Sequence, residues 1–140
     1  MAIAVDTPEQ RAKGARDSRS LVLVVDDEES YRQGLASGLS REGFAVEVAA
    51  DGHEALRLFH RIHPDLVLLD VMLPDSSGVE VCRTLKNDPK TASVTIVMLT
   101  AKAQSADLEE AEDAGADGYF TKPFSPVALL RRVDKIFKGE

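Results

Sequence analysis

The sequence predicts a single α/β domain in which a parallel sheet is covered by helices on both faces. Short apolar runs without polar alternation recur along the chain, and such runs are typical of strands buried on both faces of a parallel sheet. Segments with a helical apolar period separate these runs, which favours right-handed β-α-β crossovers. The length of 140 residues is that of one domain.

Five segments are predicted to be strands. The first is the clearest, because the run LVLVV is mostly β-branched and ends abruptly at Asp26. β-branched side chains favour extended backbone. The predicted strands are Leu21–Val25, Phe44–Ala50, Leu66–Leu69, Val94–Leu99 and Gly118–Thr121.

A helix is predicted after each strand, because apolar residues recur there three or four positions apart. Ser125 followed by Pro126 is typical of an N-cap residue with proline at the first helical position. The residues that give the helical periods are Tyr31, Leu35 and Leu39; Ala55, Leu58 and Ile62; Val81 and Leu85; Leu108 and Ala111; and Leu130, Val133 and Phe137.

Five β-α units suit an open five-stranded parallel sheet of the flavodoxin-like order 2-1-3-4-5, with helices on both faces. In such sheets ligands bind at the carboxyl ends of the strands, beside the point where the strand order reverses. The residues that end the strands are therefore the candidates for function.

Charge and composition exclude several classes of partner. The chain has 17 basic and 24 acidic residues, a net charge of -7 and a pI near 5.0, which argues against a nucleic-acid surface and against an anionic membrane face. The single cysteine, Cys82, excludes an internal disulfide and a cysteine metal cluster. No apolar run approaches the ~20 residues of a membrane span, and the N-terminus lacks the features of a secretory signal. We therefore expect a cytoplasmic protein.

Residues 1–20 differ in composition from the remainder. They are polar and small and show no apolar period, which is typical of a flexible segment. We expect a flexible leader over residues 1–20 and one folded domain over residues 21–140.

Charged and polar residues stand where the predicted strands end: Asp26 and Asp27 at the first, Asp70 at the third, Thr100 at the fourth and Lys122 after the fifth. Under the predicted topology they converge on one edge of the sheet. Three carboxylates at close range repel one another unless a cation compensates. A few oxygen ligands open to water suit Mg²⁺.

This set of side chains is suited to phosphoryl transfer to a carboxylate. Asp70 would be the nucleophile, the metal and Lys122 would neutralise the equatorial oxygens, and Thr100 would bind one of them. An aspartate pair after a strand is by itself often only the start of a helix, but its occurrence together with Thr100 and Lys122-Pro123 is far more specific.

Four motifs of the chain carry a resemblance to a known family: LVLVVDDEES, PDLVLLDVMLPDSSGVEVCRTLK, VTIVMLTA and DAGADGYFTKPFS. They resemble the receiver domain of bacterial two-component response regulators, including the chemotaxis regulator. The resemblance covers residues 21–138.

The resemblance implies that Asp70 is the phosphoacceptor. Asp26 and Asp27 match the acidic pair that holds Mg²⁺, Asp27 directly and Asp26 mainly through water. Met72 matches the position whose backbone carbonyl also binds the metal.

The resemblance also implies a switch. Thr100 matches the hydroxyl residue that shifts towards the phosphoryl group, and Lys122 matches the lysine that pairs first with the aspartate and then with the phosphoryl oxygens. Tyr119 matches the aromatic residue that turns inward when Thr100 moves, and the Lys122–Pro123 peptide bond is expected to be cis. These changes would bias a surface made by the fourth helix, the fifth strand and the fifth helix.

By the same resemblance, the donor is the phosphohistidine of a sensor histidine kinase or of a phosphotransfer protein. The domain would catalyse its own phosphorylation and dephosphorylation without being a metabolic enzyme. The sequence leaves open the output partner and any phosphorylation-dependent homodimer. It also leaves open whether this is a single-domain regulator or a receiver from a longer protein.

Two positions near the site suggest a long-lived phosphoryl state. Met72 lies two residues after Asp70, and Lys102 lies two residues after Thr100. In the family these positions tune hydrolysis of the acyl phosphate. Met72 cannot orient a water molecule, and Lys102 could reach the phosphoryl group.

Two other functions remain as alternatives. A phosphate-independent interaction scaffold could keep the same fold, although the five candidate residues at the strand ends count against it. A metal-dependent phosphatase with an aspartyl nucleophile would carry an Asp-x-Asp pattern after the first strand, whereas this chain has Asp26-Asp27 there.

Overall fold

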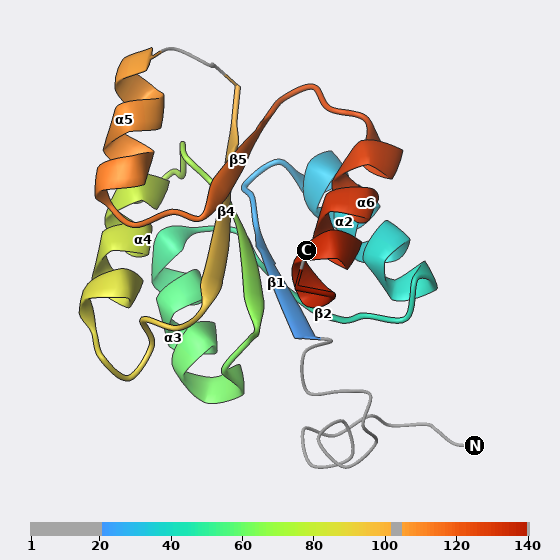
Figure 1. The fold of residues 1–140 in the computed structure, drawn as a ribbon, viewed down its shortest axis with the longest axis horizontal. Coiled ribbons are helices and arrows are strands. Elements are labelled where there is room, and N and C mark those ends of the chain that lie inside the picture. Colours follow the sequence, from blue (N-terminus) through green and yellow to red (C-terminus); the bar gives the residue numbers. More distant parts are fainter. Residues whose placement is uncertain (1–20, 102–104, 140) are drawn as a thin grey trace.

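The computed structural model describes residues 21–101 and 105–139. The predicted leader, residues 1–20, and Lys102 lie outside the described residues. Strands and helices alternate along the described chain (Figure 1). The elements are β1 (Leu21–Val25), α2 (Glu29–Arg41), β2 (Ala45–Ala49), α3 (Gly52–Ile62), β3 (Leu66–Asp70), α4 (Gly78–Asn87), β4 (Thr95–Thr100), α5 (Ser105–Asp113), β5 (Gly118–Thr121) and α6 (Pro126–Phe137).

The strands form one parallel sheet in the order β2-β1-β3-β4-β5. This arrangement confirms the predicted α/β class and the predicted strand order. The register pairs Val25 with Leu69, and Asp70 with Leu99. The carboxyl ends of β1, β3 and β4 therefore stand level with one another at one edge of the sheet.

Several strand boundaries differ from the predicted ones by one residue. Asp70 and Thr100 are the last residues of β3 and β4, so the sheet's own hydrogen bonds hold their backbones. β1 and β3 are buried throughout, whereas β2 and β5 are only partly buried, because they are the two edges of the sheet. The prediction that apolar runs form strands buried on both faces is thus correct for the central strands and wrong for the two edge strands.

Helices cover both faces of the sheet, with α3, α4 and α5 on one side and α2 and α6 on the other (Figure 1). Successive side chains of a strand point to opposite faces. Accordingly, Leu23 and Val25 belong to the core beneath α3, α4 and α5, and Val22 and Val24 belong to the core beneath α2 and α6.

The aromatic residues are unevenly divided between the two cores. Of the five phenylalanines, Phe59 belongs to the core beneath α3, α4 and α5, and the other four pack on the α2 and α6 side. Ring pairs on that side are Tyr31 with Phe124, Phe120 with Phe124, and Phe44 with Phe137, with centroids 5.5, 5.9 and 5.1 Å apart.

Helix α6 begins as the sequence predicted, with Ser125 as its side-chain cap and Pro126 as its first residue. Its inner face differs slightly from the prediction, because Leu129 is fully buried and Leu130 only partly. Either leucine is compatible with a helical period that includes Val133, so only the contact with the sheet decides between them.

The one cysteine is a packing residue. Cys82 is a free, buried thiol that donates a long hydrogen bond of 3.7 Å from Sγ to the Ala114 carbonyl. Burial raises the pKa of this thiol to about 11, so the reactive thiolate is scarce at neutral pH.

Among the helices of the described ranges, none combines the length and the apolar character that a membrane crossing requires.

Candidate functional site

Three carboxylates meet at the carboxyl edge of the sheet. Asp26 directly follows β1 and Asp70 ends β3, and these strands are neighbours in the sheet. One carboxylate oxygen each from Asp26, Asp27 and Asp70 lies within 4.8 Å of the others. Asp26 and Asp70 are buried and Asp27 is exposed, so the cluster is open to solvent on one side.

The turn between β1 and α2 fixes Asp26 through its backbone and its side chain. The Asp26 N–H donates to the Ala49 carbonyl at 3.1 Å, and the Arg32 guanidinium donates to the Asp26 carbonyl at 2.8 Å. Asp26 Oδ1 accepts the Glu28 N–H at 2.9 Å. These bonds leave Asp26 Oδ2 as the oxygen that faces the other charges.

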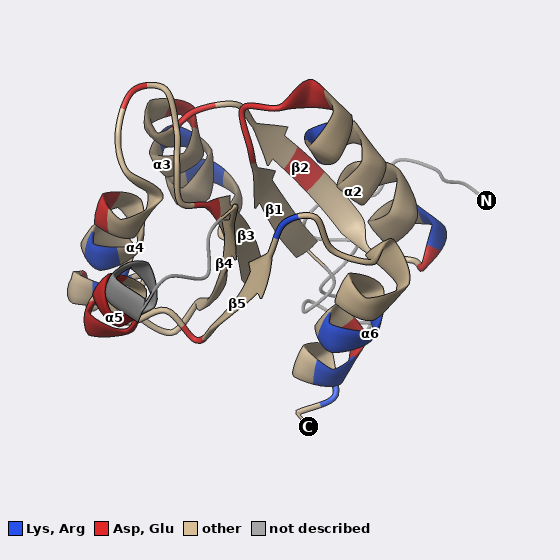
Figure 2. Cartoon of the chain, turned by 90° about the horizontal axis from the view of Figure 1, so that it is seen from above, with Lys and Arg blue, Asp and Glu red and all other residues tan. Residues whose placement is uncertain are grey.

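Lys122 brings a buried positive charge to the carboxylates. Its Nζ lies 2.7 Å from Asp26 Oδ2, 3.3 Å from Glu28 Oε1 and 3.4 Å from Asp70 Oδ2. It also lies 4.3 Å from the centroid of the Tyr31 ring, within the range of a cation–π contact. In Figure 2 the chain has basic colouring just after β5 and acidic colouring along the turn that leads from β1 into α2.

The pairing keeps Lys122 charged. Burial would lower its pKa, but pairing with Asp26 and Asp70 outweighs burial and raises the pKa. A lysine with a raised pKa remains an ammonium at neutral pH and so presents a permanent positive charge.

The pKa of Asp70 is also raised, but for a carboxyl group a raised pKa disfavours the charged form. Burial and the neighbouring charge of Asp26 raise its pKa to about 6, although Lys122 acts to lower it. Most of the population is therefore ionised at pH 7, but the carboxylate is held at a free-energy cost. Any added cation near Asp70 would reduce that cost.

The cluster fits a hard divalent cation. Asp26 Oδ2 is buried and, within the described residues, receives no hydrogen bond of good geometry despite its ion pair with Lys122. Together with Asp27 and Asp70, it offers carboxylate oxygens beside an open, solvated side. Mg²⁺ prefers this donor set, because it binds a few carboxylates and keeps several waters.

The loop after β3 folds back tightly over Asp70. The Met72 N–H donates to Asp70 Oδ1 at 3.2 Å, and Met72 pairs with Ser77 across the loop. The Gly78 N–H donates to the Val71 carbonyl at 2.7 Å. A Cβ at Gly78 would collide with the Asp70 carbonyl, so only glycine allows α4 to begin so close to this residue.

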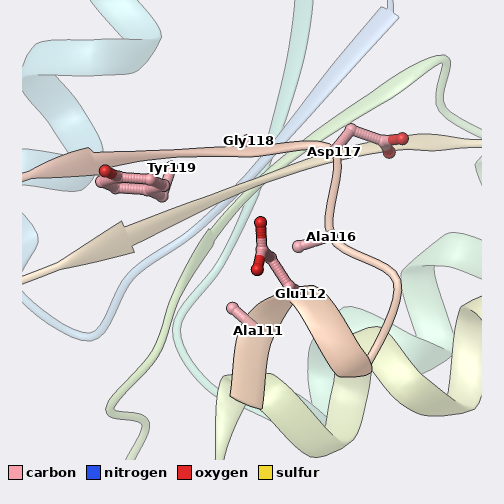
Figure 3. Close-up of a pocket in the computed structure, with 6 residues that line it drawn as sticks. All are labelled: Ala111, Glu112, Ala116, Asp117, Gly118 and Tyr119. Carbon is pink, nitrogen blue, oxygen red and sulfur yellow. The ribbon is translucent and has the colours of Figure 1, made fainter. Parts of the chain in front are cut away.

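Thr100 lies on β4, the strand next to that of Asp70, and Tyr119 lies on β5, one strand further along the sheet. Thr100 is buried, and its carbonyl accepts the Lys122 N–H at 2.7 Å. Tyr119 is 50% exposed and borders a hollow of about 210 Å³ between α5 and β5, whose lining includes Ala111, Glu112 and Asp117 (Figure 3). The Lys122–Pro123 peptide bond is cis.

Three residues of this site were not predicted from the sequence to have a role in it. Tyr31 fitted the apolar period of its helix, and that period hid its contact with Lys122. Glu28 continues the acidic run Asp26-Asp27, but nothing in the run indicates which of its members would reach Lys122. Gly78 had a usable signal, because a glycine directly before a helical period often marks a close backbone approach.

A doubly wound α/β domain with a carboxylate cluster and a buried lysine at the carboxyl edge of its sheet has the arrangement suited to accepting a phosphoryl group on an aspartate. The chain belongs to the response regulator receiver domain family, whose family model matches residues 22–134. This membership confirms the resemblance drawn from the motifs. Receiver domains of this family accept phosphoryl groups from histidine kinases and generally bind Mg²⁺.

Curated relatives include the DNA-binding response regulator MtrA of Mycobacterium tuberculosis, which is 46% identical over 115 residues, covering 82% of this chain and 49% of the relative. The probable transcriptional regulator ycf27 of Guillardia theta is 43% identical over 122 residues, covering 87% of this chain and 47% of the relative. This chain thus spans about half the length of the curated relatives it matches.

Solved structures show the same fold. The chemotaxis response regulator CheY4 of Vibrio cholerae aligns with a TM-score of 0.79 at 33% identity, covering 84% of this chain and 98% of that chain. The response regulator DrrB, a Thermotoga maritima OmpR/PhoB homologue, aligns with a TM-score of 0.77 at 32% identity, covering 85% of this chain and 52% of that chain.

Proposed function

We propose that this chain accepts a phosphoryl group on Asp70 from the phosphohistidine of a sensor histidine kinase or of a phosphotransfer protein. One observation carries the assignment to Asp70. Its carboxylate is buried beside Asp26 and lies 3.4 Å from the Lys122 ammonium. Among the carboxylates of the cluster, Asp70 is the one that belongs to a strand, as the last residue of the middle strand β3, at the edge of the sheet where a ligand is expected to bind.

In the proposed transfer, an oxygen of ionised Asp70 attacks the phosphorus atom while the phosphorus–nitrogen bond of the phosphohistidine breaks. The electron pair of that bond leaves with the imidazole, which departs neutral when its other nitrogen carries a proton. The Lys122 ammonium would pair with one phosphoryl oxygen, and the Thr100 hydroxyl would donate to another. Lys122 is suited to this role because its raised pKa keeps it charged.

Four groups of this chain are proposed to hold Mg²⁺: the carboxylates of Asp26, Asp27 and Asp70, and the backbone carbonyl of Met72. When bound, the ion supplies charge compensation for the phosphoryl oxygens. Asp26 and Asp70 would then be relieved of part of their mutual repulsion, which contributes to the raised pKa of Asp70.

The switch that we propose uses Thr100 and Tyr119. Phosphorylation adds about −1.5 to −2 charge at one point, and Thr100 would move towards it. Tyr119 would then turn inward and change the surface formed by α5, β5 and α6. The half-exposed ring of Tyr119 and the hollow beside it give this residue room for such a change.

The output of the proposed switch is a contact with a protein. The net charge of -7 disfavours direct nucleic-acid binding by this chain, although the mycobacterial relative is named as DNA-binding. We place the chain in the cytoplasm, where the free thiol of Cys82 would remain reduced. The folded domain is proposed to comprise residues 21–140, after a leader of residues 1–20.

The proposed function is tested by phosphorylation with a small phosphodonor in the presence of Mg²⁺. Intact mass and peptide mapping would be compared for the parent, for Asp70→Asn, and for Asp88→Asn as a matched control at a partly exposed aspartate outside the cluster. We expect one phosphoryl adduct in the parent and in the Asp88 variant, and none in Asp70→Asn. Light scattering of the same samples reports whether a homodimer forms.

Three results would contradict the proposal. An adduct that persists in Asp70→Asn would place the acceptor elsewhere. Absence of any adduct, with small donors and with a cognate kinase, would favour the phosphate-independent scaffold. Turnover of many phosphoester molecules per protein would favour the phosphatase.

A further inference from the structure

The loop that follows the candidate phosphoacceptor is tied at its tip to a different helix. Asp75 lies in this loop, and its carboxylate spans the start of α3. Asp75 Oδ1 accepts the Gly52 N–H at 2.9 Å, and Asp75 Oδ2 accepts the His53 N–H at 2.9 Å. One side chain thus joins two segments that are more than 20 residues apart in the sequence.

These bonds complete the N-terminal cap of α3. The first N–H groups of a helix have no acceptors within the helix. At α3, the preceding residue supplies a side-chain acceptor for one of these groups only. Asp51 Oδ1 accepts the Glu54 N–H at 2.8 Å, while the Gly52 and His53 N–H groups are bound by Asp75. The same N–H groups hold the pKa of Asp75 below its usual value, because hydrogen bonds donated to a carboxylate favour its charged form.

Gly52 makes the close approach possible. A Cβ at Gly52 would collide with Ser76 Oγ, and Ser76 Oγ lies 3.3 Å from Asp75 Oδ1. The start of α3 and the tip of the loop are therefore in direct contact, and a side chain at Gly52 would force Ser76 to move.

The base of the loop is held independently. Val71 and Gly78 are joined by a backbone hydrogen bond of 2.7 Å, and Met72 pairs with Ser77. Met72 is thus the residue of the base from which the loop continues to the tip, and its N–H donates to Asp70 Oδ1 at 3.2 Å. The conformation of the loop at Met72 is thus constrained by the contacts of the base and by the contact of Asp75 with α3.

We propose that Asp75 is a positioning residue for the metal site, because its contact with the start of α3 holds the loop in the conformation that places the Met72 backbone beside Asp70. This inference rests on the proposed function, in which the Met72 carbonyl is a ligand of Mg²⁺. Asp75 does not touch the metal or the phosphoryl group in this proposal. It acts through the backbone of the loop, as outer partners of metal ligands do.

The test uses Asp75→Ala and Asp75→Asn in the full chain. Amide hydrogen exchange at Gly52 and His53 reports the contact itself, and Mg²⁺ titration followed by NMR reports metal affinity without phosphorylation. For Asp75→Ala we expect loss of protection at both amides and an increase of about 10-fold in the Mg²⁺ dissociation constant. Asp75→Asn keeps one acceptor oxygen and should give a smaller increase.

A kinetic measurement separates positioning from loss of the site. The rate of phosphorylation by a small phosphodonor would be measured against Mg²⁺ concentration. In Asp75→Ala the Mg²⁺ concentration at half-maximal rate should rise in step with the dissociation constant. The maximal rate at saturating Mg²⁺ should be retained, because Asp70 and Lys122 are unchanged.

Two control variants reproduce separate effects of Asp75→Ala, namely the loss of a cap of α3 and the loss of a negative charge. Asp51→Ala removes the other side-chain cap of α3 and so weakens the same helix without releasing the loop. Glu80→Gln removes one negative charge from the exposed face of the first turn of α4 without touching the contact. Both controls should bind Mg²⁺ as the parent does.

The inference is wrong if Asp75→Ala loses amide protection at Gly52 and His53 yet binds Mg²⁺ with the affinity of the parent. It is also wrong if Asp51→Ala or Glu80→Gln weakens Mg²⁺ binding to the same extent, since helix stability or charge alone would then explain the effect. Failure of the parent to bind Mg²⁺ or to be phosphorylated would overturn the proposed function itself, and this inference with it.

Discussion

The Lys122 ammonium lies 2.7 Å from the Asp26 carboxylate, and both side chains are almost wholly withdrawn from solvent, with 8% and 0% exposed. The same ammonium lies 3.4 Å from Asp70. Lys122 is therefore paired most closely with a candidate metal-binding residue rather than with the candidate phosphoacceptor. This leaves its contact with Asp70 free to be exchanged for a contact with a phosphoryl oxygen.

The first prediction concerns the stability of this buried pair. Lys122→Ala leaves the Asp26 charge buried without its partner, and we expect a loss of about 3 kcal/mol in the free energy of unfolding. Lys138→Ala is the control, because Lys138 pairs with Asp134 at a similar 2.9 Å but with both side chains more than half exposed. That variant should lose less than about 1 kcal/mol, measured by urea unfolding in the same buffer.

The double variant Asp26→Asn/Lys122→Ala checks the explanation. It removes both charges, so it should recover part of the stability lost in Lys122→Ala. A double variant that is no more stable than Lys122→Ala would mean that lost packing, and not the unpaired charge of Asp26, causes the destabilisation.

The second prediction concerns pH and the metal-free protein. The pKa of Asp70 is about 6 in the folded state and about 4 in an unfolded chain, so the folded state binds this proton more tightly. The stability contributed by Asp70 is therefore fully present below about pH 4 and is lost as the pH rises through about 6. Asp70→Asn does not titrate, so with a chelator at pH 7 it should be more stable than the parent by about 1–2 kcal/mol.

The measurement is thermal or urea unfolding of both proteins between pH 4 and pH 8. The advantage of Asp70→Asn should shrink towards the acid end of this range, and added Mg²⁺ should stabilise the parent more than the variant. An advantage that is constant across the range would show that ionisation of Asp70 is not its cause.

The third prediction concerns the glycine that closes over the phosphoacceptor. Gly78→Ala would press a methyl group against the Asp70 carbonyl, and we expect a destabilisation of about 1–3 kcal/mol from overpacking. Gly34→Ala is the control, because nothing lies within 4 Å of its added methyl group in the middle of α2. That variant should be stabilised by about 0.5–1 kcal/mol, and opposite signs for the two variants would be the decisive result.

The fourth prediction concerns the lifetime of the phosphoryl group. The Met72 side chain is 70% exposed and cannot orient an attacking water molecule. Met72→Asn supplies a hydrogen-bonding group at this position, and a contribution of about 1.4 kcal/mol to the transition state would accelerate phosphate release about 10-fold. Release would be followed by a phosphate assay after removal of the phosphodonor.

Val127→Asn, at an exposed position of α6, provides the control for this experiment and should release phosphate at the parent's rate. Rapid release by the parent that is unchanged in Met72→Asn would refute the hypothesis of a long-lived phosphoryl state.

The fold could be predicted from the sequence because the apolar runs, the helical periods and the cap residues all indicated the same order of strands and helices. The apolar run that forms β1 has no polar alternation, and it lies in the centre of the sheet. Local patterns were less informative where two registers fit equally well. Leu129 and Leu130 are adjacent on α6, and only packing against the sheet makes Leu129 the deeper of the two.

The candidate site was predictable as far as strand ends determine it. Parallel topology requires Asp26, Asp70 and Thr100 to share one edge of the sheet, and the register places them there. Contacts made by loops and helix faces could not be predicted in this way. Examples are the contact of Lys122 with Tyr31 and the hydrogen bond that Asp75 accepts from the start of α3. Both depend on how the helices pack against the sheet, and no local sequence pattern indicates that packing.

Because the aromatic rings are unevenly divided between the two cores, spectroscopic signals from these rings report unequally on the two halves of the domain. Since the chain has no tryptophan and four of its phenylalanines pack on the α2 and α6 side, near-ultraviolet circular dichroism and ring-current shifts would follow mainly that half of the molecule. Tyr31 belongs to this half and touches Lys122, so its fluorescence offers an intrinsic probe of events at the carboxylates. On the opposite half, Phe59 is the ring of the core and Tyr119 borders the hollow between α5 and β5, so a Tyr119→Phe variant would let the fluorescence of Tyr31 be followed alone.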